Sequence, residues 1–286
     1  MSIKLEHINY IYGNDTANPV HATNDVSLEI KDGEFVGLMG HTGSGKSTLI
    51  QHFNGLIRPT SGNIYYNGKN ISDEDFSMKQ LRQKVGLVFQ YPEHQLFEVT
   101  VFDDVCFGPK NLGLSKEEIK EKAKQALALV GLDESYYERS PFELSGGQKR
   151  RVAIAGVLAM EPEILILDEP TAGLDPKGRD DILSMISHLH KEKKITIILV
   201  SHSMEDIANY AQRIIVMDKG QVKFDGTPKE VFSHYKELEQ IGLAAPQVTY
   251  IVNQLKEHGW DINTHITTLE EAKKEILKLW KQRKHI

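Results

Sequence analysis

Apolar and polar residues alternate along much of the first third of the chain, a pattern typical of half-buried strands. Strands are predicted over residues 3–12, 26–30, 34–39, 63–66 and 85–89. The turn Lys31-Asp32-Gly33 separates two of them, which predicts a hairpin. The segment GHTGSGKST at 40–48 then leads into a helix predicted over 49–56.

The middle of the chain has helical spacing. Ser115 and Glu118 form the capping-box pattern at the start of a helix over 116–130, and a second helix is predicted to begin near Ser145. Strands and helices then alternate, with a strand at 164–168, a helix at 176–191, a strand at 196–200, a helix from 204 and a strand at 214–218. This alternation predicts a mostly parallel sheet covered by helices, in the α/β class, and two strands are apolar on both faces as buried parallel strands are.

The chain changes character after Pro246. A short helix is predicted near Val252, a turn at Gly259 and a last helix over 269–283. The last helix has apolar residues at helical spacing, namely Leu269, Ala272, Ile276, Leu279 and Trp280. Two interpretations stay open: a small interaction appendage, or a packing helix that covers the domain's own core.

Composition limits the function. The chain has 286 residues, of which 40% are hydrophobic, enough for a sizeable core. Its 40 acidic and 34 basic residues give a net charge of -6, which disfavours a role dominated by nucleic-acid binding. Cys106 is the one cysteine, so no intrachain disulfide can form, which fits a reducing compartment. No secretory signal or apolar run of ~20 residues occurs, so we expect a soluble chain that reaches a membrane only through a partner.

The segment at 40–48 carries the first candidate chemistry. Gly40, Gly45, Lys46 and Ser47 match the pattern G-x-x-x-x-G-K-[ST] between a predicted strand and a predicted helix. Backbone N–H groups of such a loop form an anion nest, Lys46 supplies a charge to the β- and γ-phosphates, and the Ser47 hydroxyl can ligate Mg²⁺. The predicted nucleotide-binding residues of this loop are Gly40, Thr42, Gly43, Ser44, Gly45, Lys46, Ser47 and Thr48.

A pair of carboxylates, Asp168 and Glu169, follows the apolar strand ILIL. Alternation along a strand predicts that the two point to opposite sides. One can then hold Mg²⁺ through its waters while the other faces the attacking water. Ligands of open α/β sheets bind where this pair lies, at the carboxyl ends of the strands. By itself, an acidic pair is explained equally well by a surface turn.

The pentapeptide LSGGQ at 144–148 precedes a predicted helix. Ser145, Gly146 and Gly147 make a small-residue helix N-terminus that can accept an anion. In isolation the pentapeptide favours an ordinary N-cap, with Ser145 capping and the basic residues after Gln148 solvated. The other motifs reverse that preference.

Taken together, the motifs resemble an ATP-binding cassette (ABC) ATPase. In chain order they are the phosphate-binding loop (P-loop), Gln90 after a strand, LSGGQ, ILILDEP at 164–170, GLDP at 173–176, and a strand leading to His202. The resemblance covers about residues 3–235. It implies a P-loop NTPase with a RecA-like parallel-sheet core, an N-terminal antiparallel β subdomain, a helical signature subdomain near 91–160 and a small helical extension. The ATPase domain is placed at 1–245 and the extension at 246–286.

The resemblance also implies roles for single residues. Tyr12 resembles the aromatic residue that stacks on adenine, with a buried strand tyrosine as the alternative. Gln90 resembles the Q-loop glutamine that senses Mg²⁺ and the water, and Glu169 the catalytic base. His202 resembles the switch histidine at the γ-phosphate, and Asp175 the D-loop aspartate that communicates across a dimer.

ATP and Mg²⁺ are the implied cofactors, with Ser47, Gln90 and Asp168 near the metal. The resemblance implies that two subunits meet head to tail, so that each ATP lies between one P-loop and the other subunit's 145–148. His41, inside the P-loop, is left without a role.

A narrower resemblance is carried by FQYPEHQLFEVTVFDDVCFGPKNLG at 89–113, by 40–56 and by 168–179. These segments are similar to the ATPase subunits of energy-coupling factor (ECF) transporters, the CbiO-like group, and within it to the second of two paired ATPases. That implies prokaryotic uptake of vitamins or transition-metal ions, driven at the cytoplasmic face of the membrane beneath a transmembrane T component that carries substrate-binding S components.

Two surfaces are predicted to meet these partners. Residues 91–107 are expected to form a groove for a T-component helix, with a locally buried loop as the alternative, and their apolar members are Leu96, Phe97, Val99, Val101 and Phe102. Ile276, Leu279 and Trp280 are expected to help select a non-identical ATPase partner, although a homodimer is geometrically allowed.

Other functional classes fit less well. A soluble ABC protein acting on nucleic acid or ribosomes is the alternative, but translation-type members carry two cassettes in one chain and repair-type members insert a long coiled coil. Neither feature is present, and the net charge is acidic. A non-catalytic regulatory cassette is expected to lack Glu169 or His202, and both are present.

Overall fold

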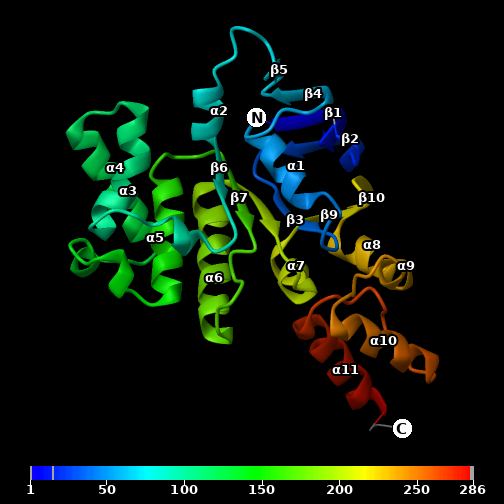
Figure 1. Ribbon diagram of the computed structural model, residues 1–286. Helices are drawn as coiled ribbons and strands as arrows, with labels where there is room; N and C mark the ends of the chain where they lie inside the picture. Colours follow the sequence, from blue (N-terminus) through cyan, green and yellow to red (C-terminus); the bar gives the residue numbers. More distant parts are fainter. Residues whose placement is uncertain (1, 15, 284–286) are drawn as a thin grey trace.

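The computed structural model describes residues 2–14 and 16–283, and a six-stranded sheet lies at its centre (Figure 1). The strand order is β10-β9-β3-β8-β7-β6, parallel except for the antiparallel edge strand β10. The strands are β3 (Phe35–Met39), β6 (Val85–Val88), β7 (Ile164–Asp168), β8 (Thr196–Val200), β9 (Arg213–Asp218) and β10 (Gln221–Gly226). The predicted parallel core is confirmed, whereas β10 was missed.

A second, antiparallel sheet covers part of one face, with strand order β2-β1-β4-β5. Its strands are β1 (Ser2–Tyr12), β2 (Val20–Lys31), β4 (Ser61–Tyr66) and β5 (Lys69–Asn70). The predicted hairpin around the turn 31–33 is wrong, because β2 pairs with β1 while β3 pairs with β8 and β9. The physical reason is burial: every residue of β3 is buried, so β3 takes a central place in the parallel sheet.

The two faces of the central sheet enter different hydrophobic cores. On β3, Phe35 and Met39 pack into the larger core with the helices, whereas Val36 and Leu38 pack against the antiparallel sheet and α1. The helices of this part are α1 (Lys46–Phe53), α2 (Met78–Lys84), α6 (Pro176–Lys193), α7 (Met204–Tyr210), α8 (Pro228–Ser233) and α9 (Tyr235–Gln240). The helix expected over 49–56 therefore begins and ends three residues earlier.

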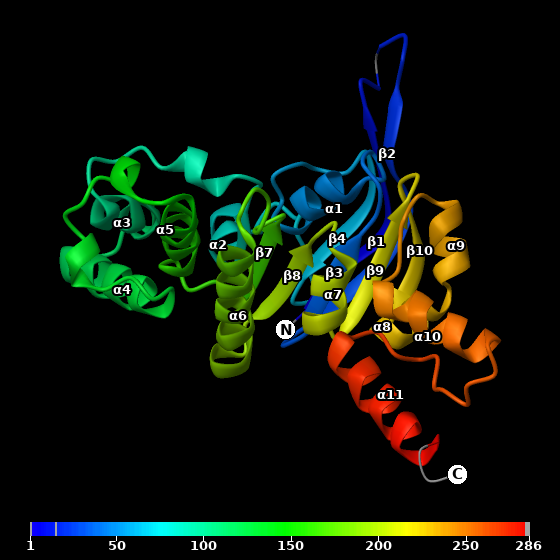
Figure 2. The same cartoon turned by 90° about the horizontal axis from the view of Figure 1, so that it is seen from below.

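Three helices lie together at one side of the molecule, as Figures 1 and 2 show in green: α3 (Val101–Leu112), α4 (Lys116–Leu129) and α5 (Gly146–Leu158). The predicted capping box of α4 is present, since the Glu118 N–H donates to Ser115 Oγ and the Ser115 N–H donates to Glu118 Oε2. Short 3₁₀ turns lie at Pro92–Gln95, between β6 and α3, and at Glu134–Tyr136 and Pro141–Glu143, between α4 and α5.

At the opposite end lie α10 (Gln247–Glu257) and α11 (Leu269–Arg283), orange and red in Figure 1. They share a small core in which Val248, Val252 and Ala272 are buried and Ile276 and Leu279 pack at the edge. Leu269, Leu277 and Trp280 remain exposed. Helix α11 thus closes a core of its own and keeps an apolar face outward. Within the described residues, the helices are all too short or too polar to cross a membrane.

Candidate nucleotide-binding site

A pocket of about 400 Å³ opens at the carboxyl ends of the parallel strands. Most of the predicted residues on the P-loop side line it together, although they lie far apart in sequence: Tyr12, Thr42, Gly43, Gly45, Lys46, Ser47, Thr48, Gln90, Asp168, Glu169 and His202. Val20, His21 and Ala22 of β2 also line it, and the sequence did not indicate them. These residues reach the pocket because Tyr12 pairs with Val20 in the antiparallel sheet, which places the start of β2 beside Tyr12.

Gly40 and Ser44 do not line the pocket but shape its loop. A Cβ on Gly40 would collide with Ser44 Oγ and with the Met217 carbonyl oxygen. Gly45 has φ +102, and its Cβ would collide with the carbonyl oxygen of Ala22. These positions need glycine because carbonyl oxygens of β9 and β2, and the loop's own Ser44 Oγ, occupy the space that a Cβ would need.

The N-terminus of α1 faces this pocket through Gly45, Lys46 and Ser47. Its N-cap is Gly45, and no side chain of the described residues caps it. Its first turn holds no acidic residue. The backbone N–H groups and the positive end of the helix dipole are therefore directed to an anion that enters the pocket.

Lys46 supplies the positive charge of the site. It is 7% exposed, and its Nζ donates to the carbonyl oxygens of Gly40 at 2.7 Å and His41 at 3.1 Å. Burial lowers the pKa of Lys46, while the nearby Glu169 and Asp168 carboxylates oppose that shift. An incoming phosphate can replace these neutral acceptors with a charged one.

The Asp168 and Glu169 carboxylates do not point to opposite sides, as the strand alternation predicted. Strand β7 ends at Asp168, and Glu169 has φ +51, so alternation no longer governs its direction. Both carboxylates line the same pocket instead of pointing to opposite sides. Burial raises the pKa of Asp168, and Lys46 opposes this.

Glu169 has the environment of a base. Burial raises its pKa to about 7, against a backbone hydrogen bond from His202. Its Oε1 is buried with no hydrogen-bond partner among the described atoms, and His202 Nε2 lies 3.4 Å away. Burial and Lys46 lower the pKa of His202, which favours a neutral imidazole at neutral pH. An unpaired carboxylate oxygen beside a neutral imidazole can accept a proton from a bound water.

Tyr12 is 44% exposed, which excludes the alternative of a buried strand tyrosine. Its hydroxyl lies 3.2 Å from Thr48 Oγ1, and its ring meets Tyr10 edge-on at 4.8 Å between centroids. The ring is thus oriented by two contacts and forms part of the pocket wall. Such a ring can stack on a planar base.

The remaining predicted residues lie in a second pocket, of about 430 Å³. Ser145, Gly146, Gly147, Gln148 and Asp175 line it, and it shares no residue with the P-loop pocket. The two halves of the predicted site are thus separate within one chain.

The N-terminus of α5 in this second pocket is capped by its own residues. Ser145 Oγ accepts the Gln148 N–H at 3.3 Å, and the Ser145 N–H donates to Gln148 Oε1 at 2.9 Å. A Cβ on Gly146 or Gly147 would meet no atom within 4 Å, so this surface is open. Asp175 caps α6 in the same way, since its Oδ1 accepts the Gly178 N–H.

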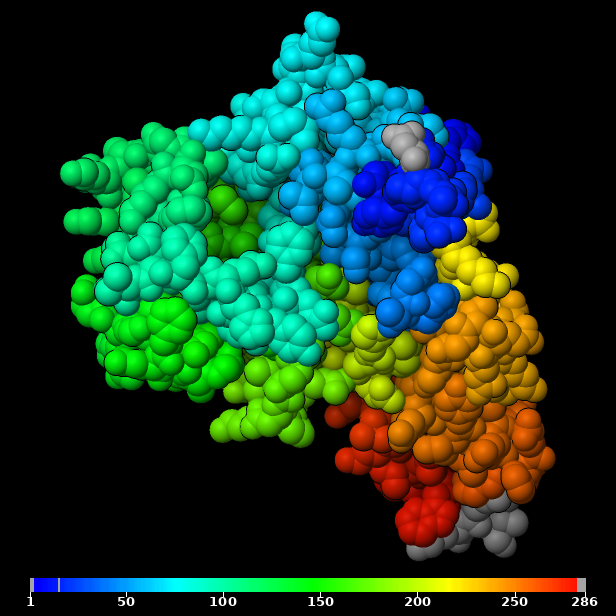
Figure 3. All heavy atoms as spheres, in the orientation of Figure 1, coloured from blue at the N-terminus to red at the C-terminus, as the bar shows by residue number. Residues whose placement is uncertain are grey.

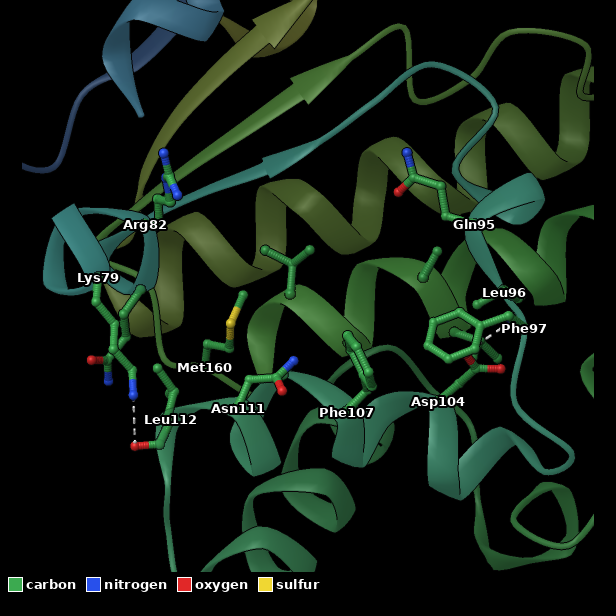
Figure 4. Close-up of a pocket in the computed structure, with 16 residues that line it drawn as sticks. Lys79, Arg82, Gln95, Leu96, Phe97, Asp104, Phe107, Asn111, Leu112 and Met160 are labelled. Carbon is green, nitrogen blue, oxygen red and sulfur yellow. Dashed lines mark hydrogen bonds between the residues drawn. The ribbon is translucent and has the colours of Figure 1, made fainter. Parts of the chain in front are cut away.

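A third hollow, of about 480 Å³, lies between α2 and the helices α3 and α5 (Figures 3 and 4). Figure 4 shows Lys79 and Arg82 at one end and Phe97 and Asp104 at the other. Leu96 and Phe97 line this groove as expected, and Phe107 meets the Phe97 ring edge-on at 4.9 Å.

Three other apolar residues expected in the groove lie elsewhere. Val101 is in the core, Phe102 stacks on Tyr137, and Val99 does not line the hollow. The prediction failed for Val101 and Phe102 because α3 begins at Val101 and turns these residues inward, whereas Val99 lies before the helix and is exposed. Phe97 is 58% exposed, so the alternative of a locally buried loop is excluded at that position.

Comparison with known proteins agrees with this geometry. The ABC transporter family model matches residues 23–172. A Clostridium tetani protein named energy-coupling factor transporter ATP-binding protein EcfA2 is 60% identical over 98% of both chains, and its Caldanaerobacter subterraneus namesake is 54% identical over the full length of both.

Solved structures show the same fold. CbiO1 from Clostridium perfringens, described as part of the ABC transporter complex cbiONQ, has a TM-score of 0.72 at 42% identity, covering 84% of this chain and 93% of that one. The ATP-binding cassette MJ0796, solved with ADP and Pi after hydrolysis, has a TM-score of 0.69 at 33% identity, covering 79% and 98%. The chain is therefore an ATP-binding and ATP-hydrolysing member of the ABC transporter family, and it belongs among the ATP-binding proteins of energy-coupling factor transporters.

Proposed function

We propose that this chain is one of two ATPase subunits that energise a multi-subunit importer for vitamins or transition-metal ions. The separation of its two half-sites carries the proposal. The P-loop pocket supplies Lys46 and the carboxylates, and the 145–148 pocket supplies an open helix N-terminus, with no residue in common. A second subunit placed head to tail brings one pocket of each type onto each ATP.

In this arrangement the chain's own residues divide the chemistry. Lys46 and the α1 N-terminus hold the phosphates, Tyr12 stacks on the base, and Glu169 accepts the proton of the attacking water. His202, held neutral, donates a hydrogen bond toward the γ-phosphate. Asp175 and the α5 N-terminus serve the ATP of the partner subunit.

Mg²⁺ fits the residues present. The Ser47 hydroxyl and the Asp168 carboxylate line one pocket with Gln90, and such a sparse oxygen set suits a cation that keeps waters and uses nucleotide phosphates. Within the described residues no group of three or more His, Cys, Asp or Glu could hold a metal by itself. When bound, the ion neutralises charge that develops on the phosphates.

The groove between α2, α3 and α5 is proposed to receive a helix of the T component, which would hold the subunit at the cytoplasmic face of the membrane with an S component as the specificity element. Its exposed Phe97 and Phe107 make an apolar floor suited to a helix-in-groove contact. A net charge of -6 gives no support to the alternative, action on nucleic acid.

Residues 1–245 are proposed as the ATPase domain and 246–286 as the unit that associates the two ATPases. Ile276 and Leu279 pack on the unit's own core, so the association face is revised to Leu269, Leu277 and Trp280, which are exposed at helical spacing. A face of this kind favours a related, non-identical partner through shape and charge.

A single substitution tests the membrane partner. Phe97→Gln should release the chain from membranes, while ATP binding by the released chain survives, because the P-loop pocket is untouched. Val99→Gln is the matched control, since Val99 is 79% exposed but does not line the groove. Retained membrane association of the Phe97 variant would mean that docking uses another surface.

Co-expression tests the second ATPase. The chain is expressed alone and together with its genomic neighbours, and the membrane complexes are identified by mass. We expect a second cassette protein in every active complex. Fully active transport by complexes that contain only this ATPase would refute the proposed heterodimer.

A further inference from the structure

One buried side chain joins the turn next to the groove to the turn that follows Glu169. Arg150 lies in helix α5, and its side chain is 1% exposed, whereas the ordinary N-cap alternative for 144–148 would have left it solvated. It forms an ion pair with Glu93, which lies in the 3₁₀ turn Pro92–Gln95 after Gln90. Resting on the proposed function, we propose that Arg150 is a positioning residue that couples the occupied groove to the turn carrying Glu169.

The guanidinium group holds two segments at once. Its Nε and Nη2 donate to the Glu93 carboxylate at 3.1 and 2.6 Å. Its Nη1 donates to the carbonyl oxygens of Pro170 at 3.0 Å and Ala172 at 2.8 Å. A planar fork can satisfy a carboxylate on one side and two carbonyls on the other, which a lysine ammonium cannot do in the same geometry.

On the groove side, both partners of the ion pair are continuous with groove residues. Glu93 is followed by Gln95, Leu96 and Phe97, which line the hollow, as Figure 4 shows. On α5, Arg150 is followed two residues later by Val152, which lines it too. A helix that enters or shifts in the groove would therefore press on α5 and on the turn that carries Glu93, which the ion pair joins.

On the catalytic side, the two carbonyls belong to the turn after Glu169. The Ala172 N–H donates to the Glu169 carbonyl oxygen at 3.1 Å, and the Glu169 N–H donates to the Val200 carbonyl oxygen at 3.0 Å. Displacing the Pro170 and Ala172 carbonyls thus changes where the Glu169 side chain lies relative to His202, 3.4 Å away. Tyr91 lies beside the same turn, since a Cβ on Gly173 would meet its ring at 3.6 Å.

Arg150 does not line the P-loop pocket. Arg150 is therefore expected to affect the position of the Glu169 side chain and not the binding of ATP. Misplacing a catalytic group by about an ångström can cost on the order of tenfold to hundredfold in rate. The structure thus assigns to Arg150 an effect on kcat that leaves KM for ATP in place.

The test uses the whole membrane complex with Arg150→Gln, Glu93→Gln and the double variant. We expect each single variant to lower kcat about tenfold or more while KM for ATP stays within about twofold. Because both residues act through one ion pair, the double variant should match Arg150→Gln instead of multiplying the two losses. Glu93→Gln is nearly isosteric, so it keeps the test available if the arginine variant does not fold.

Arg213→Gln is the matched control. Arg213 pairs with Glu34 and Asp225 at the other end of the strands, so its loss should lower stability without changing kcat per folded molecule. Unchanged kcat in the Glu93 variant, or losses that multiply in the double variant, would overturn the proposal for Arg150. Failure of the unmodified chain to enter a membrane complex would instead contradict the proposed function.

Discussion

The N-terminus of α1 faces the P-loop pocket and that of α5 faces the 145–148 pocket, and the two are built in opposite ways. Helix α1 begins at Gly45 without a side-chain cap, and the lysine and carboxylates around it are desolvated. Helix α5 begins with a complete capping box, in which Ser145 and Gln148 satisfy each other's N–H groups. The first end is suited to a ligand, and the second is stable without one.

This difference predicts that the two helix N-termini differ in their affinity for ATP. An uncapped N-terminus beside a buried lysine gains much from an anion, so the P-loop side should bind ATP in the single subunit. A self-capped N-terminus gains less, so in the proposed head-to-tail dimer the 145–148 side should bind ATP weakly. Closure of that dimer would then be easily reversed once phosphate leaves.

The largest effect is expected at Glu169. Glu169→Gln should keep ATP affinity, because Lys46 and the loop amides remain, and should lower kcat roughly 10²-fold or more, because an amide cannot accept the proton. Single-turnover hydrolysis and nucleotide binding measure the two separately. Rapid turnover by the variant would show that Glu169 is not the catalytic base.

The buried carboxylate also makes stability depend on pH on the P-loop side. Folding raises the pKa of Glu169 from its usual 4.5 to about 7. The protonated carboxyl therefore contributes to the free energy of unfolding in full below pH 4.5, and this contribution is lost as pH rises through 7. Glu169→Gln lacks this loss, so at pH 8 its free energy of unfolding should exceed that of the unmodified chain by roughly 3 kcal/mol. Urea unfolding at pH 4.5 and pH 8 measures it, and a pH-independent difference would contradict the assignment.

Lys46→Ala tests the uncapped end directly. Losing a charged donor to phosphate should weaken ATP binding by the single chain on the order of tenfold to hundredfold. Ser47→Ala is a useful comparison, since it removes the neighbouring hydroxyl and keeps the charge. Calorimetric titration with ATP gives both affinities, and an unchanged value for Lys46→Ala would count against the P-loop assignment.

Ser145→Ala gives the smallest effect and probes the capped end. Loss of the cap should cost about 1 kcal/mol of stability while ATP affinity of the single chain stays the same. Ser115→Ala removes an equivalent cap from α4, away from both pockets, and serves as the control. Weaker ATP binding by the Ser145 variant alone would break the proposed contrast between the two ends.

Much of the fold could be predicted because its signals are local. The apolar strands β7 and β8, the glycine pattern of the P-loop and the capping box at Ser115 depend on neighbours within a few residues. The identity of most pocket residues followed from motifs of the same kind. Their roles remain predictions that the experiments above address.

Other features depend on partners far away in the chain. The predicted hairpin at 31–33 is wrong because β3 is buried between β8 and β9 in the other sheet. The predicted direction of Glu169 is wrong because its positive φ ends the strand alternation.

The sequence by itself determined that this chain binds a nucleotide on a parallel α/β sheet, since short-range spacing encodes the loop, the strands and the helix starts. Tertiary structure alone decided that Val20 and His21 border the P-loop pocket and that Arg150 is buried against Glu93. The physical reason is that desolvation and ion pairing act between segments brought together only by folding, and no local pattern records them.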